Sequence, residues 1–364
     1  SIGIIMGLWV FGAAHVAITA NVFAEMGTSL PQSGGAYIYA QRAFGDIGGL
    51  IVGWSSWLAF IAGIAAAAIS FANFLPLIWP WASDHTVGVA FAMLLALCGA
   101  NILGLRAGRL LQETTSLIKA SMLVLFCVAA VLFVPPSHPA PLPAMAVPLM
   151  GWAAIVSAYQ LVRGAYAGWD TPLFFSEEIV NPGRDIPRAI FIGIAITAVL
   201  YIGVNGALLY ALGVDGVAST SLPFTIVVGN FGGIASLLFA LTAMITVASC
   251  ANANIMGGPR IIFSMARDGL LPDFFQSVNR GGSPSGAMLL TALFSAGVTL
   301  SGTFNLVFGL IGTMNALGGI IIIVGLFVLR RREPDLPRPY RAFLYPVLPV
   351  VALVLEATTL VLYS

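Results

Sequence analysis

Two charged side chains, Arg163 and Asp170, lie within an apolar stretch long enough to cross a membrane. Charged residues at membrane depth are costly, and they usually serve binding, pairing or transport. A guanidinium can hold a carboxylate through two parallel hydrogen bonds, which makes Arg163 a candidate substrate contact. An equally good interpretation gives Arg163 a gating or packing role, paired with a carboxylate of the protein such as Asp170.

Gly164, Gly168 and Pro172 predict that a membrane helix is broken in the same stretch. Proline has no N–H to donate to the carbonyl of Gly168, and glycine tolerates the backbone angles that a break requires. We therefore expect a first half-helix that ends near Val162, followed by an unwound segment over residues 163–170.

The second half-helix is expected to start at Pro172, with Thr171 as its N-cap, and to run toward Ile179. Irregular backbone at membrane depth is tolerated only where it is buried in protein or lines a cavity, and broken helices often form the binding sites of transporters. The last carbonyls of the first half-helix suit a substrate ammonium. Tyr166 and Trp169 can close over that substrate.

The composition indicates a protein that crosses the membrane many times. Of its 364 residues, 59% are hydrophobic and 8% are charged, whereas soluble domains carry about 25% charged residues. The lipid bilayer is therefore an expected partner, and the net charge of +1 gives no indication of a nucleic-acid partner. Ten apolar runs reach spanning length, at residues 4–26, 47–77, 87–104, 112–134, 151–179, 188–212, 226–262, 285–303, 306–329 and 342–363.

Basic residues gather in alternate connections between these runs. The loops at 27–46, 104–111, 176–188, 260–284 and 330–341 hold 13 of the 15 Lys and Arg residues. The positive-inside rule places these loops in the cytoplasm, so we expect a multi-pass protein of the cell membrane, such as a prokaryotic inner membrane. The proline-rich link at 135–150 is then outside the cell.

This topology predicts an inverted repeat of five plus five helices. Residue 1 would lie outside the cell, which favours one missing helix before the first run. Residues 1–134 then form the remainder of the first repeat and residues 151–330 the second, which the broken helix begins. Residues 331–364 add a C-terminal helix, and the whole chain forms a single transmembrane domain.

Ordered motifs make the chain resemble the amino acid–polyamine–organocation permeases. The segment PQSGGAY at 31–37, with Gly45 and Gly53-Trp54, is similar to that family's PxSGGxY…FG…GW signature. The other similar positions are Glu25, Arg260 and the segments 166–169, 177–182, 185–187, 265–272, 329–331 and 334–340. The resemblance implies the leucine-transporter (LeuT) fold, with helices two to eleven of a usual twelve and with the first helix absent.

Lys119 lies about two turns inside a predicted spanning helix. It has either a functional role or a snorkelling position near the cytoplasmic interface. In many sodium-independent members of the family that the chain resembles, a lysine at the matching point takes the place of a sodium ion. The resemblance therefore implies that Lys119 is the coupling residue, that it holds two helix bundles together or releases a proton, and that sodium is not used.

Asn252 either makes hydrogen bonds between helices or, as the resemblance implies, faces the substrate from the eighth helix. The family usually has apolar residues at position 163 and a bulky aromatic residue at position 164, so Arg163 and Gly164 leave room for a larger or acidic substrate. The substrate-binding residues that we expect are Arg163, Gly164, Tyr166, Ala167, Gly168, Trp169 and Asn252. His15 is interpreted as a packing histidine rather than a proton relay, and Glu356 as a residue that faces the membrane interface.

The sequence contains no catalytic set, no metal-spaced Cys/His cluster and no nucleotide-binding loop. We therefore expect no enzyme activity, cofactor or metal. The predicted function is secondary transport of an amino acid or related amine by alternating access, coupled to protons or to exchange. The alternatives are a polyamine or organic cation exchanger, a passive channel, and a truncated homologue that acts as a sensor or structural subunit without transport.

Overall fold

The computed structural model describes residues 2–136, 151–220, 223–301 and 304–363. Most of the proline-rich link at 135–150 lies outside these residues. The α-helices are α1 (Ile2–Ser29), α2 (Ala36–Phe74), α3 (Thr86–Leu103), α4 (Leu105–Phe133), α5 (Trp152–Ala165), α6 (Pro182–Ala218), α7 (Pro223–Gly229), α8 (Gly233–Arg267), α9 (Ser285–Ser301), α10 (Phe304–Arg332) and α11 (Val347–Tyr363). Short 3₁₀ helices form η1 (Leu75–Leu77), η2 (Pro80–His85), η3 (Thr171–Glu178) and η4 (Asp273–Gln276).

Each apolar run predicted from the sequence contains a helix, and the fifth run is divided between α5 and η3. Within the described residues, seven helical stretches are long and apolar enough to cross a membrane. They lie at 2–29, 36–77, 80–102, 108–133, 182–218, 233–267 and 312–332. Helices α9 and α11 are apolar but shorter. The chain is therefore an all-helical, multi-pass membrane protein.

Two elements begin where connections were expected. Helix α2 starts at Ala36 and is kinked at Gly45, whose φ of 77° interrupts the helical angles, so its first turns precede the predicted span. Helix α7 forms because Val227 and Val228 are buried, and Val227 belongs to an apolar cluster built with α4 and α6. Tertiary burial thus gives helical structure to residues 36–46 and 223–225, which were expected to lie in connections.

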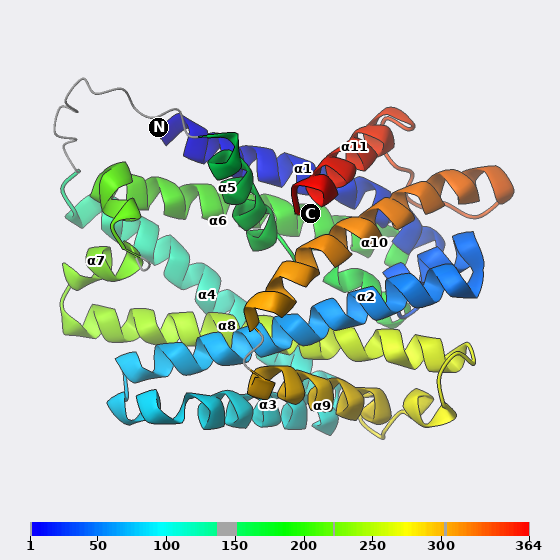
Figure 1. Ribbon diagram of the computed structural model, residues 1–364, viewed down its shortest axis with the longest axis horizontal. Coiled ribbons are helices and arrows are strands. Elements are labelled where there is room, and N and C mark those ends of the chain that lie inside the picture. Colours follow the sequence, from blue (N-terminus) through cyan, green and yellow to red (C-terminus); the bar gives the residue numbers. More distant parts are fainter. Residues whose placement is uncertain (1, 137–150, 221–222, 302–303, 364) are drawn as a thin grey trace.

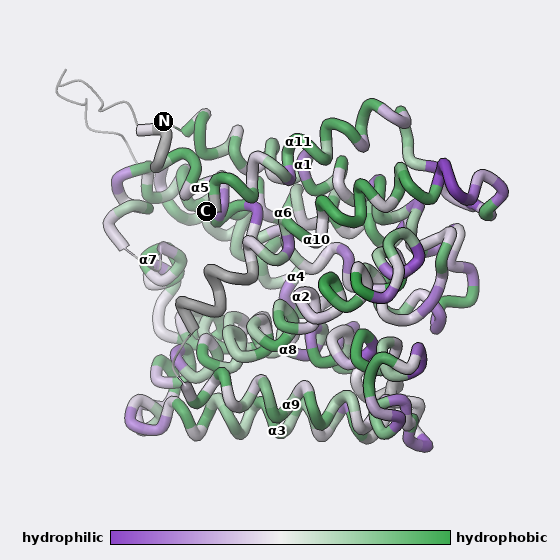
Figure 2. The backbone as a smooth tube through the Cα atoms, turned by 45° about the vertical axis from the view of Figure 1, so that its right-hand side comes forward, coloured by the Kyte–Doolittle hydropathy of each residue, from purple (hydrophilic) through white to green (hydrophobic). Residues whose placement is uncertain are grey.

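The long helices pack in pairs along their length. Helix α2 runs beside α8 and α10, α1 runs beside α6, and α5 crosses α1 steeply (Figure 1). Figure 2 shows hydrophobic residues along the helices and hydrophilic residues gathered mainly at the connections between them. This distribution fits helices that stand in a bilayer with their connections in water.

The Ser-Gly-Gly turn before α2 is wedged against η3 and α8. Gly34 and Gly35 have φ values of 110° and 53°, which glycine adopts readily. A Cβ on Gly34 would lie 2.8 Å from the Ser264 hydroxyl oxygen, and one on Gly35 would lie 2.8 Å from the Phe174 ring. The motif is therefore more than a connection, because its missing side chains let α8 and η3 approach the turn.

Glu25 joins the end of α1 to the connection after α10. Its carboxylate accepts two hydrogen bonds from Arg330, at 2.9 and 2.5 Å, and lies 3.3 Å from Nε of Arg338. It also accepts the backbone N–H of Ala342 at 2.6 Å. Glu25, Arg330 and Arg338 come from three of the separate motifs that resemble the permease family, and they are held together around one buried carboxylate.

Candidate functional site

The predicted break in the helix is present, three residues later than expected. Helix α5 ends at Ala165, residues 166–170 form turns, and η3 begins at Thr171. The second half is a 3₁₀ helix that ends at Glu178. The break therefore leaves a short non-helical segment between two half-helices, with Tyr166 and Trp169 inside it.

Thr171 satisfies the carbonyl that Pro172 leaves without a partner. The prediction that Thr171 is an N-cap is wrong, because Thr171 is the first residue of η3. Its N–H and its hydroxyl both donate to the Gly168 carbonyl, at 3.2 and 2.6 Å. Gly168 adopts a φ of 94°, which lets the chain turn into η3 at this point.

Tyr166 anchors the break to neighbouring helices. It is 4% exposed, its hydroxyl donates to the carbonyl of Trp9 at 3.1 Å, and its ring meets Trp9 and Tyr201 edge-on. Trp169 is half-buried and lies edge-on to Phe23 of α1, with ring centroids 5.2 Å apart. Both aromatic side chains therefore pack on α1, and Tyr166 also packs on α6.

The last carbonyls of α5 are not free, contrary to the expectation from the sequence. The Val162 and Arg163 carbonyls both accept the N–H of Tyr166, and the Gly164 carbonyl accepts the N–H of Ala167. The Ala165 carbonyl accepts the hydroxyl of Tyr201 at 2.8 Å. A turn after the helix and a tyrosine from α6 satisfy these groups, although each carbonyl oxygen has a second lone pair.

Open space lies beside the backbone of the break. Gly164, Ala167 and Gly168 are exposed. A Cβ on Gly164 would meet nothing within 4 Å, and one on Gly168 would meet only the Thr171 hydroxyl oxygen, at 3.8 Å. A ligand can therefore approach the main chain here more closely than at a residue with a side chain.

Arg163, in the last turn of α5, pairs with Glu356 of α11. One of its Nη atoms lies 2.6 Å from Oε2 of Glu356. The interpretation that Glu356 faces the membrane interface is wrong, because this residue is 2% exposed. The carboxylate that the structure places against Arg163 is Glu356 rather than Asp170. His15 of α1 is also buried and contacts Glu356.

Asn252 lies in a hydrogen-bond network between α3, α4 and α8. Its amide oxygen accepts from Asn101 at 2.7 Å, and its amide nitrogen donates to the Gly108 carbonyl and to Gln112, at 3.2 and 3.1 Å. Asn252 is completely buried. The oxygen and the nitrogen of its amide therefore both bond to other helices. Such interhelical hydrogen bonding was one of the two roles that the sequence indicated for Asn252.

Lys119 bridges α4 to α8. It is half-buried, and its ammonium nitrogen lies 3.4 Å from the hydroxyl oxygen of Ser249, which is itself buried. The contact links two helices, one before and one after the proline-rich link.

Two ion pairs that sequence reasoning missed fasten η3 to α8. Glu177 lies 2.9 Å from Arg267 and accepts the backbone N–H of Ser33 at 3.1 Å, and Glu178 lies 3.2 Å from Arg260. Burial raises the pKa of Glu177, but the hydrogen bonds and charge of Arg267 and the Ser33 N–H outweigh it and lower the pKa below the ordinary value. The sequence did contain a signal for these pairs. Glu177 and Glu178 lie in a connection predicted to be cytoplasmic, and Arg260 and Arg267 lie in another connection predicted on the same side.

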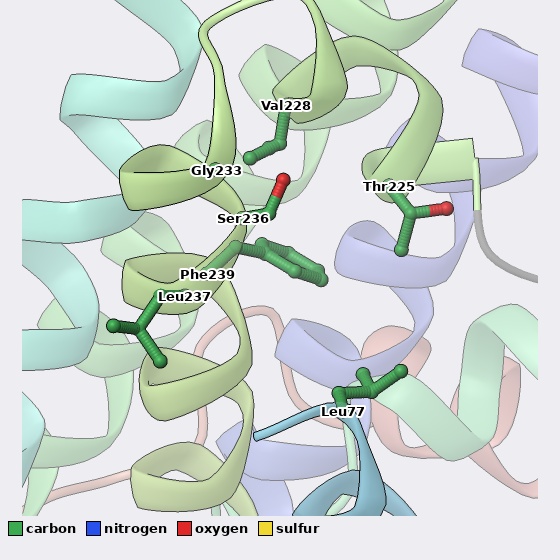
Figure 3. Close-up of a pocket in the computed structure, with 7 residues that line it drawn as sticks. All are labelled: Leu77, Thr225, Val228, Gly233, Ser236, Leu237 and Phe239. Atoms are coloured by element: carbon green, nitrogen blue, oxygen red, sulfur yellow. The ribbon is translucent and has the colours of Figure 1, made fainter.

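Two cavities lie away from the break. One of about 290 Å³ is lined by residues of η1, α7 and α8, among them Leu77, Thr225 and Phe239 (Figure 3). The other, of about 190 Å³, lies beside the ion pairs and is lined by Ser33 and Arg260, among others. Neither is lined by Tyr166 or Trp169.

Comparison with known proteins gives one family and many relatives. Residues 1–363 match the family model described as amino acid permease. The branched-chain amino acid permease BcaP of Bacillus subtilis is 25% identical over 95% of this chain and 77% of its own length. The Asc-type amino acid transporter 1 of Mus musculus is 28% identical over 99% of this chain and 70% of its own length. The serine/threonine exchanger SteT of Bacillus subtilis is 25% identical over 95% of this chain and 79% of its own length.

Proposed function

The chain belongs to the amino acid permease family. We propose that it moves amino acids with uncharged side chains across the cell membrane by alternating access. Membership makes it an amino acid transporter and not an enzyme. The relatives that act on branched-chain amino acids and on serine and threonine favour substrates whose side chains carry no charge.

The observation that carries the proposal is the open backbone between α5 and η3. The exposed main chain at Gly164, Ala167 and Gly168 offers a surface for the polar groups of an amino acid, and Tyr166 and Trp169 lie beside it. Backbone groups at a broken helix recognise charged ends without any dedicated charged side chain. We infer that Arg163, Glu356 and Asn252 support the site rather than contact the substrate directly, because Arg163 pairs with Glu356 and both ends of the Asn252 amide are hydrogen-bonded to other helices.

Lys119 supports transport without sodium. Its ammonium bridges α4 and α8 through Ser249, and a fixed cation between two helices can take the role that a bound metal cation has in sodium-coupled relatives. The energy for uphill transport then comes from exchange or from protons. We infer the five-plus-five repeat as well, with residues 151–330 as the second repeat, led by the break, and with the basic loops in the cytoplasm.

Counterflow in proteoliposomes tests the function. The protein is reconstituted into vesicles loaded with unlabelled leucine or serine, and uptake of the labelled amino acid is followed in potassium and in sodium buffers. We expect exchange at the same rate in both buffers, and no exchange of lysine or glutamate. Counterflow that requires sodium, or the absence of counterflow for any amino acid, would contradict the proposal.

A pair of tryptophan variants tests the site. Trp169→Ala removes a ring at the break, whereas Trp79→Ala removes an exposed ring beside Trp81, outside η3 and the long helices. We expect Trp169→Ala to weaken the apparent affinity for the transported amino acid at least about tenfold, the loss of about 1.4 kcal/mol of binding energy. Trp79→Ala is expected to bind as the wild type does, and equal effects of both variants would place the site elsewhere.

A further inference from the structure

A buried group of ionisable side chains lies near the middle of α1, apart from Lys119 and from the ion pairs of η3. His15 is about 20 Å from either end of this helix, at 1.5 Å per residue. Its Nε2 atom lies 3.3 Å from Oε1 of Glu356 on α11, and its Nδ1 atom contacts the hydroxyl of Tyr159 on α5. The imidazole thus touches two other helices at membrane depth.

Glu356 is the centre of the group. Its Oε2 atom lies 2.6 Å from Arg163, and its Oε1 atom accepts the hydroxyl of Thr19 at 3.2 Å. Helix α10 makes room for it, because a Cβ on Gly319 would lie 3.3 Å from the carboxyl carbon. The side chains of His15, Arg163 and Glu356 are only 1%, 15% and 3% exposed.

The charges of Arg163 and Glu356 balance each other, which leaves His15 as the side chain of this group that can bind a further proton. Arg163 is always protonated, and Glu356 balances its charge. An imidazole has an ordinary pKa of about 6.5, so it gains and loses a proton in the physiological range. Protonated, the ring donates from both nitrogens; neutral, it donates from only one. His15 can therefore alternate between two sets of contacts with α5 and α11.

The other elements packed on α1 bring few titratable groups to His15. Helix α10 carries no titratable residue from Phe304 to Leu329. Helix α6 brings Tyr201, whose ring packs on Trp9 and Tyr166 and whose hydroxyl donates to Ala165. The acidic residues at the end of η3 pair with arginines of α8, and Asp170 lies at the N-cap of η3.

We propose that His15 binds the proton that is transported together with the amino acid. The proposal rests on the transport function inferred above and adds the coupling ion and its site. One proton enters from one side of the membrane, binds a ring nitrogen of His15 and leaves toward the other side, without any change in bonds between heavier atoms. Lys119 keeps its separate role as the fixed cation between α4 and α8.

Helix α5 connects this proton site to the break. Tyr159, which contacts His15, and Tyr166, at the break, are seven residues apart and so lie on the same face of the helix, two turns apart. Gln160 also fastens α5 to α11 through a 2.6 Å hydrogen bond to the Leu362 carbonyl. Protonation of His15 strengthens the contact of Tyr159 with α1, and the half-helix carries that change to Tyr166.

Histidine NMR tests proton uptake at His15 separately from any transport assay. The sequence has three histidines, so the ring signals of ¹⁵N-histidine-labelled protein in lipid are assigned by replacing His85 and His138 with glutamine in turn. We expect the His15 signals to change from neutral imidazole to imidazolium between about pH 8 and pH 5, with a midpoint that moves when leucine or serine is added. A His15 ring that keeps one charge state across this range overturns the proposal, as does a midpoint that no transported amino acid moves.

Accumulation driven by a pH gradient is the second test. One proton per substrate gives the wild type up to about tenfold accumulation per pH unit. His15→Gln, which keeps a hydrogen-bonding side chain but cannot be protonated, is expected to lose this accumulation. His85→Gln, an exposed residue of η2, is the matched control and is expected to keep it. Equal accumulation by both variants overturns the proposal.

Counterflow separates the two levels of inference. Wild-type protein that exchanges amino acids but does not accumulate them in a pH gradient supports the transport function and overturns the proton site. Wild-type protein without counterflow overturns the transport function itself, and the NMR titration then decides separately whether His15 takes up a proton. Should His15→Gln not fold, Tyr159→Phe replaces it in the accumulation assay, with an expected fall in accumulation because the imidazolium loses one hydrogen-bond acceptor.

Discussion

Replacement of Glu25 by glutamine is expected to destabilise the protein strongly. The Glu25 carboxylate is 1% exposed and holds Arg330 through two hydrogen bonds, and it also contacts Arg338 and the N–H of Ala342. A glutamine amide has one acceptor oxygen, and its NH₂ group would face groups that can only donate. Glu25→Gln therefore leaves at least one buried cation or donor without a partner.

The expected loss follows from the burial of this group. Breaking a buried ion pair by removing one partner costs about 3–5 kcal/mol, because the other charge stays buried. Arg330 keeps 20% of its side chain exposed and Arg338 only 9%, so water relieves part of the penalty at Arg330. We expect a loss of about 3 kcal/mol in the free energy of unfolding, at the lower end of that range.

Glu333→Gln is the matched control. Glu333 also pairs with an arginine, Arg42, at 2.8 Å, but the two side chains are 27% and 55% exposed. Exposed ion pairs contribute about 1 kcal/mol or less. Unfolding in mixed micelles with increasing SDS, followed by circular dichroism, gives both losses. A loss for Glu25→Gln that is no larger than that for Glu333→Gln would refute the reasoning.

Three further substitutions test other parts of the structure. Gly34→Ala is expected to cost about 1–3 kcal/mol in the same unfolding assay, because alanine is strained at a φ of 110° and its Cβ would lie 2.8 Å from Ser264; an unchanged stability would mean that the turn can relax. Lys119→Met is expected to slow counterflow and to weaken the link between α4 and α8, and unchanged exchange rates would favour a snorkelling lysine. The lowered pKa of Glu177 means that its pair with Arg267 contributes stability above the unfolded pKa of about 4.3 and loses it as the pH falls through the folded value. The stability difference between wild type and Glu177→Gln should therefore be constant from about pH 7 to pH 5 and disappear at lower pH; a difference that persists at low pH would contradict the assigned pairing.

Local pattern predicted the helices and the break because both depend on near neighbours in the chain. Apolar length marks a spanning helix, and Gly168 followed by Pro172 removes hydrogen bonds from any helix that includes them. The position of the end of α5 was missed by three residues, because Tyr201 of α6 and the N–H groups of the following turn satisfy the last carbonyls. Contacts with a distant helix cannot be read from the local sequence.

The partners of the buried polar residues were decided by the tertiary structure alone. Glu356 is 193 residues from Arg163 and 341 from His15 in the sequence, and nothing in the periodicity of either helix indicates that they meet. A buried charge is stable only where an opposite charge or a set of donors reaches it. The fold therefore decides which carboxylate pairs with Arg163. The sequence by itself determined the class of protein, the helices and the break; the packing of α1, α5 and α11 determined which charges meet at membrane depth.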